Sequence, residues 1–101
     1  MMIKKEDYEH FLGEEISMSL QTGELIKMKL IEVLDLPPAP DSDPSAPHRL
    51  NPFILVFHGP SEPRHHSGCV MAKWGTNEPM MLGLYAEKAL ENTIVYTAIF
   101  N

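Results

Sequence analysis

The stretch PRHHSGC, residues 63–69, gathers the residue types of this chain that most readily do chemistry. His65 and His66 are adjacent, and Cys69 is the only cysteine in the sequence. Imidazole and thiolate groups are zinc ligands, and a cysteine with a nearby histidine base is the starting point of a thiol hydrolase. Two related alternatives therefore centre on these three residues: a small metal-binding protein and a Cys/His hydrolase.

Both chemistries need more groups than this stretch supplies. A zinc site needs roughly three or four convergent ligands, and adjacent residues of an extended chain point to opposite sides. His58 is the nearest further ligand by sequence, because it ends the preceding predicted strand. A hydrolase also needs an orienting group and an oxyanion hole. We therefore interpret 61–67 as a polar loop and Cys69 as a small apolar residue packed in the next strand, and we expect no catalytic residue, metal or cofactor.

Composition narrows the classes of partner. The chain has 101 residues and is predicted to be a single domain over 1–101. Its formal charge is −6, and its 8 lysines and arginines are scattered. Binding to a phosphate backbone requires clustered cations, so we expect no nucleic-acid partner. No apolar run approaches the ~20 residues of a membrane span, and the first residues have no signal-peptide pattern, so we expect a cytoplasmic protein without membrane insertion.

Hydrophobic periodicity predicts a mainly β fold, a small antiparallel β-barrel of about six strands with a short N-terminal helix. Tyr8, Phe11 and Leu12 share one face of the helix expected over 3–13, which we expect to cap or plug one end of the barrel. The predicted strands are 14–20, 25–36, 53–59, 68–74, 80–86 and 93–100.

Several strands carry finer signals. The alternation slips at Leu30–Ile31, which predicts a β-bulge that bends the second strand. The apolar run 53–59 is expected to be a central strand buried on both faces. In 80–86, Met80 is expected to point inward and Met81 outward. The following segment, 87–92, is interpreted as the exit of that strand with up to one helical turn.

The segment 37–52 has a different composition, rich in proline, alanine, serine and aspartate. We predict a long exposed loop, because such a segment cannot build a packed element. Its P-x-x-P spacings fit polyproline recognition by a protein partner, and an insertion without any partner explains the loop equally well. The predicted partner-binding residues are Pro40, Pro44, Pro47 and Arg49.

Three motifs resemble, in the same order, those of a family of small bacterial domains of unknown function. They are FLG at 11–13, PFILVFHGP at 52–60 and YTAIFN at 96–101, and together they span nearly the whole chain. The SGCV stretch at 67–70 departs from the Gln-Gly-x-Tyr strand of that family. The resemblance implies a small β-barrel with no established activity, often associated with phage-tail-like proteins.

We therefore predict a non-enzymatic interaction or assembly module with a protein partner. An accessory role in a phage-tail-like or secretion apparatus is what the resemblance adds. A further alternative is a barrel that binds a small apolar ligand in an interior cavity lined by Met18, Met28, Met71 and Met80. The sequence leaves the oligomeric state open.

Overall fold

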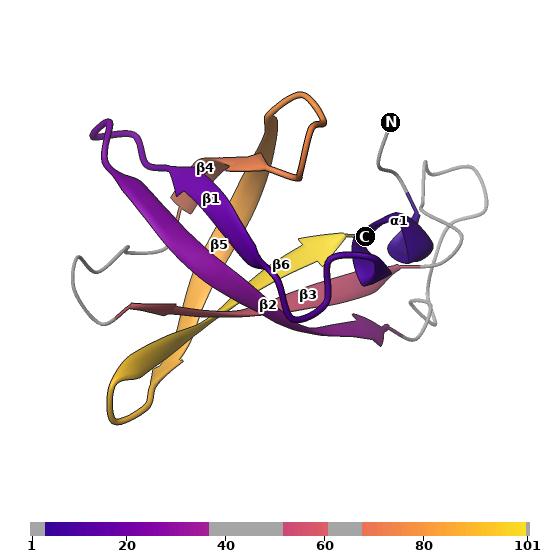
Figure 1. Ribbon diagram of the computed structural model, residues 1–101. Helices are drawn as coiled ribbons and strands as arrows, with labels where there is room; N and C mark the ends of the chain where they lie inside the picture. Colours follow the sequence, from indigo (N-terminus) through magenta and orange to yellow (C-terminus); the bar gives the residue numbers. More distant parts are fainter. Residues whose placement is uncertain (1–3, 37–51, 61–67, 101) are drawn as a thin grey trace, which may run out of the picture.

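The computed structural model describes residues 4–36, 52–60 and 68–100, which form a closed antiparallel barrel with one short helix (Figure 1). The strand order around the barrel is β1-β2-β3-β6-β5-β4, and β4 returns to pair with β1. The predicted fold class is confirmed. The elements are α1 Lys5–Glu9, β1 Glu15–Ser19, β2 Leu25–Asp35, β3 Phe53–Pro60, β4 Gly68–Lys73, β5 Met80–Ala89 and β6 Thr93–Phe100.

The barrel consists of two three-stranded meanders, β1-β2-β3 and β4-β5-β6, whose long middle strands form its corners. The first half of β2 pairs with β1 and its second half with β3, while β5 pairs first with β4 and then with β6. Each middle strand has a register shift, between Leu30 and Glu32 in β2 and between Ala86 and Lys88 in β5. The bulge predicted at Leu30–Ile31 is therefore confirmed, and both bulges lie where a strand must bend.

Side chains alternate between the barrel interior and the outer face. Met80 is half-buried and Met81 is exposed, as expected from the sequence, and Leu82 and Leu84 are buried. The expectation that β3 is buried on both faces is wrong, because only every second residue of that strand is buried. A closed barrel has a single interior, so even its most apolar strand keeps one face toward the outside.

Helix α1 covers one end of the barrel and is shorter than predicted, since 10–13 form turns rather than helix (Figure 1). Tyr8 is fully buried, and its ring centroid lies 5.0 Å from that of Trp74, 5.3 Å from Phe100 and 5.6 Å from Phe53. An aromatic cluster therefore fills this end, as the capping role predicted. No helix of the described residues is long and apolar enough to cross a membrane.

The exit of β5 differs from the prediction for 87–92. The strand continues to Ala89, and the backbone N–H of Leu90 donates to the carbonyl of Thr93 at 2.7 Å, which closes a hairpin to β6. No helical turn forms there. The bulge around Glu87 interrupts the apolar–polar alternation of β5. The second half of the strand therefore lacks the two-residue period by which strands are predicted from sequence.

Candidate functional site

The predicted partner-binding residues Pro40, Pro44, Pro47 and Arg49 lie outside the described residues, and so do His65 and His66. Their roles stay predictions. Of the three residues in the PRHHSGC stretch that were selected for chemistry, Cys69 has a described position, on strand β4.

Cys69 is exposed, so the expectation that it packs as a small apolar residue is wrong. It shares the outer phase of β4 with Met71 and Lys73, while Val70 and Ala72 are buried. Its partner across the ladder to β5 is Gly83. The strand phase decided this outcome: Val70 and Ala72 point into the core, so Cys69, in the alternate phase, points outward whatever its size.

His58 does not approach Cys69. It lies on the outer face of β3, and both β6 and β5 stand between β3 and β4 in the strand order. Three strand spacings correspond to about 14 Å along the sheet. In the part of the chain that the structure describes, no group of three or more His, Cys, Asp or Glu side chains could hold a metal ion.

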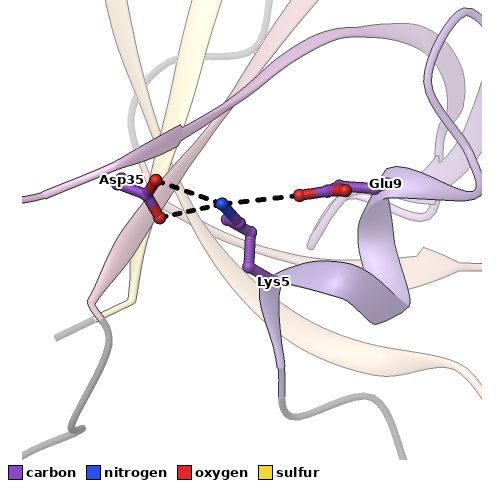
Figure 2. A network of polar contacts seen from close by, with 3 residues as sticks. All are labelled: Lys5, Glu9 and Asp35. Atoms are coloured by element: carbon purple, nitrogen blue, oxygen red, sulfur yellow. Dashed lines mark hydrogen bonds and ion pairs between the residues drawn. The ribbon is translucent and has the colours of Figure 1, made fainter.

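The residues at the two ends of the long connection between β2 and β3 are joined by a hydrogen bond, and we call this point the base of the connection. The backbone N–H of Leu36 donates to the carbonyl of Pro52 at 2.9 Å, which ties the two ends together. Beside this base, Lys5 of α1 lies between two carboxylates, 3.0 Å from Asp35 and 3.6 Å from Glu9 (Figure 2). The hydrogen bond that Lys5 donates to Asp35, supported by the charges of Asp35 and Glu9, raises the pKa of the Lys5 ammonium.

An apolar strip crosses the outer face next to this base. Leu34 of β2 is the ladder partner of Ile54 of β3, which is in turn the partner of Ile99 of β6. Leu34 and Ile99 are each 44% exposed, and Ile54 is half-buried. Directly opposed side chains have Cβ atoms about 5 Å apart, so these three residues form one continuous strip, which we call the outer apolar row.

A second outward-facing row reaches β5. Two positions along β3 from Ile54, Val56 is the partner of Thr97 of β6, and Thr97 is the partner of Tyr85 of β5. Tyr85 is 52% exposed, whereas Thr97 is nearly buried and its hydroxyl donates to Glu87 Oε1 at 2.8 Å. The exposed ring of Tyr85 is therefore a separate aromatic group beside the row, and Thr97 lies between it and β3.

The outer face on the other side of the barrel is polar. The outward residues of β1 and of the ladder to the first half of β2 are Glu15, Ser17, Ser19, Lys27 and Lys29, with Leu25 at the end. Exposed apolar residues also occur elsewhere, such as Leu25 and Met81, and scattered single ones need no explanation. A continuous row of apolar side chains across three strands is typical of an interaction surface. Sequence reasoning missed the row, because its members come from three strands and meet only through the register.

The predicted interior cavity is not assembled as expected. Met18 and Met28 are buried, but Met71 is 40% exposed on the outer face and cannot line the interior. Met80 is half-buried, and its sulfur accepts a hydrogen bond from the Tyr8 hydroxyl at 3.6 Å. Strand β4 points Met71 outward for the same reason that it exposes Cys69.

Comparison with known protein families gave one match. The family described as a domain of unknown function, DUF6916, matches residues 3–100, which include the helix and all six strands. Comparisons with curated proteins and with solved structures gave no match.

Proposed function

Because the chain belongs to the DUF6916 family of domains of unknown function, its surface is the basis for assigning a role, and we propose that it is a non-enzymatic module that binds a protein partner through the outer apolar row. The row, Leu34, Ile54 and Ile99, is the observation that carries this function. It lies on rigid strands of a closed barrel, so a partner would meet a preformed surface.

The position of the row favours a protein partner that also uses the proline-rich segment. That segment joins the barrel at Leu36 and Pro52, directly beside Leu34 and Ile54 of the row. A partner seated on the row would therefore be next to the chain that carries the predicted contacts. Apolar and aromatic side chains at the centre of an interface, with polar groups at its rim, are the usual composition of a protein–protein contact.

Charge supports protein rather than nucleic acid as the partner. The net charge is −6, and the exposed Lys29 is the ladder partner of Glu15, so the polar side of the barrel carries both signs. Phosphate binding needs a one-sided cluster of cations. Given the resemblance noted from the sequence motifs, the partner to test first is a structural protein of a phage-tail-like or secretion apparatus.

Affinity capture from the lysate of a native host, read by mass spectrometry, tests this function. Four baits are compared: the intact chain, the double variant Leu34→Asp with Ile99→Asp, the single variant Leu25→Asp, and a variant lacking residues 39–47. Leu25 is an exposed leucine at the polar side of the barrel, so its substitution is the matched control. Circular dichroism establishes that each bait is folded.

We expect the double variant to lose a partner that the intact chain and the Leu25→Asp variant both retain. Two buried aspartates at an interface leave unpaired charges, which weakens binding strongly. A partner lost only with the 39–47 deletion would place the contact in the loop and contradict the role of the row. A partner bound equally by all four baits, or no specific partner for any of them, would refute the proposed function.

A further inference from the structure

Three sulfur-containing side chains lie together on the outer face of β4 and β5. Met71 of β4 is the ladder partner of Met81 of β5, and Cys69 lies two residues before Met71 on the same face. Met71 is 40% exposed, Met81 is 67% exposed, and Cys69 is an exposed free thiol. We call these three residues the sulfur cluster.

The ladder places these three side chains next to one another on one face. Directly opposed residues such as Met71 and Met81 have Cβ atoms about 4.5–5.5 Å apart, and diagonal neighbours such as Cys69 and Met81 have Cα atoms about 7–8 Å apart. Methionine has three rotatable side-chain bonds, so its thioether can cover such distances. Opposite Cys69 stands Gly83, where a Cβ atom would meet nothing within 4 Å, so no side chain opposes Cys69 across the ladder.

We propose that Cys69, Met71 and Met81 bind a soft monovalent metal ion, Cu(I), on this face. Thiolate and thioether ligands select Cu(I) over harder ions. On binding, the Cys69 thiol releases its proton and its sulfur forms a bond to the metal, while the two methionine sulfurs donate as neutral ligands. One thiolate charge then balances the single charge of the ion, so the complex adds no net charge to this face.

The surroundings favour a soft ion over zinc. Among the described residues no set of three His, Cys, Asp or Glu side chains could hold a metal, so the described part of the chain offers Cys69 no partners of the kind that complete a zinc site. The one cation on the same face of β4 is Lys73, and its ammonium donates to the backbone carbonyl of Asn77 in the β4–β5 turn. The lysine is therefore held toward the turn by its own hydrogen bond.

Titration of the full chain with Ag(I), a redox-inert soft ion, tests the site. The protein carries ¹³C-labelled methionine methyl groups, and the buffer is free of chloride and thiols. We expect a single Ag(I) ion per chain and shifts of the Met71 and Met81 methyl signals, while the buried Met18 and Met28 do not respond. Competition with a chromophoric Cu(I) chelator then gives the affinity for Cu(I) itself.

Substitutions separate a three-sulfur site from a simple thiol adduct. Met71→Leu, Met81→Leu and Cys69→Ser should each weaken Ag(I) binding by about tenfold or more, because each removes one of three ligands. Met80→Leu is the matched control, since Met80 precedes Met81 and faces the interior. All variants are exposed-site or volume-conserving changes, and thermal unfolding checks that each remains folded.

Three results would overturn the site. Binding that is lost in Cys69→Ser but unchanged in both methionine variants would show an ordinary silver–thiol adduct. Binding that survives the methionine changes but is lost in a His65→Ala, His66→Ala double variant would show a different site. Failure of Ag(I) to bind while the outer apolar row captures a partner would refute the metal site alone and leave the proposed function standing.

Discussion

At the scale of single residues, missing side chains shape the barrel interior as much as large ones do. A Cβ atom at Gly59 would lie 2.9 Å from Cε2 of Tyr96 and 3.1 Å from Cγ of Met28, so β3 approaches the core too closely for any side chain. Gly83, in contrast, faces open space on the outer side of β5. The two glycines have opposite surroundings in otherwise similar strands.

These surroundings predict opposite effects of adding a methyl group. Gly59→Ala should lower the free energy of unfolding by about 1–3 kcal/mol, because the ring of Tyr96 and the chain of Met28 must move in a packed core. Gly83→Ala should leave it unchanged or raise it by up to ~1 kcal/mol, because alanine restricts the unfolded chain. Urea denaturation of both variants measures the difference. Equal effects of the two substitutions would contradict the close packing at Gly59.

At the scale of elements, a buried ring and an ion pair help to hold α1 to the barrel. The five-residue helix is too short to be stable by itself, so its docking depends on Tyr8 among the aromatic rings and on the bridge from Lys5 to Asp35. Asp7 also accepts a hydrogen bond from the backbone N–H of Lys4 at 2.9 Å, which satisfies one donor at the start of the helix.

Removal of the buried ring should open this end of the barrel. Tyr8→Ala is expected to cost about 3–5 kcal/mol, as for other large aromatic side chains in a core, and to let iodide quench the fluorescence of Trp74. Trp74 is the only tryptophan and is fully buried, so it reports on this end alone. Glu6→Ala, at an exposed position of the same helix, is the control. Unchanged quenching in Tyr8→Ala would contradict the capping role of α1.

The ion pair predicts a dependence of stability on pH. The pKa of Lys5 is raised above its ordinary value of 10.5, chiefly by the hydrogen bond to Asp35. The contribution of the charged form is therefore fully present below pH 10.5 and is lost as the pH rises through the raised value. At neutral pH the natural chain should be slightly more stable than Lys5→Gln, as for exposed ion pairs generally. This difference in the free energy of unfolding should shrink as the pH rises through the raised pKa of Lys5.

Stability measurements from neutral pH to about pH 11 check this dependence. Lys27→Gln provides the control, since Lys27 is an exposed lysine of β2 that makes no ion pair among the described residues. High salt should reduce the Lys5 effect, because screening weakens a partly exposed pair. A Lys5→Gln difference that grew with pH would contradict the stabilising role of the ammonium.

At the scale of the whole molecule, the two meanders are joined unequally. Strands β3 and β6 pair along their whole lengths, Phe53–Pro60 against Thr93–Phe100, whereas β1 and β4 pair only over residues 17–19 against 71–73. The two meanders are therefore joined by a long seam, the β3–β6 ladder, and by a short seam, the β1–β4 ladder, which has fewer interactions. Local opening of a fold starts where the fewest interactions must break.

Amide hydrogen exchange should reveal this inequality. We expect the amides of β1 and β4 to exchange through a lower-energy opening than those of β3 and β6, because the short seam can separate while the long one remains closed. Exchange measured residue by residue in the native state gives the comparison within one molecule. Equal opening free energies for the two seams would show that the barrel unfolds only as a unit.

Only part of the two candidate sites could be predicted from the sequence. The outward phase of Met81 followed from the alternation of its strand. The same alternation put Cys69 and Met71 on one face of β4, but the sequence did not show that this face is the outer one, and both residues were expected inside. Their meeting with Met81 could not be predicted, because it depends on the register of β4 against β5. The row of Leu34, Ile54 and Ile99 was invisible for the same reason, since its members lie up to 65 positions apart in the chain.

The sequence by itself determined the helix, the six strands, the bulge at Leu30–Ile31 and the face of most strand residues. These features depend on residues a few positions apart in the chain. Their apolar and polar side chains alternate with a period of two in a strand, and a break in that alternation marks a bulge. The tertiary structure decided the order β1-β2-β3-β6-β5-β4, the burial of Tyr8 and the composition of both outer surfaces. Those depend on which distant strands pair and in which register, and a shift of one residue would turn every outward side chain inward.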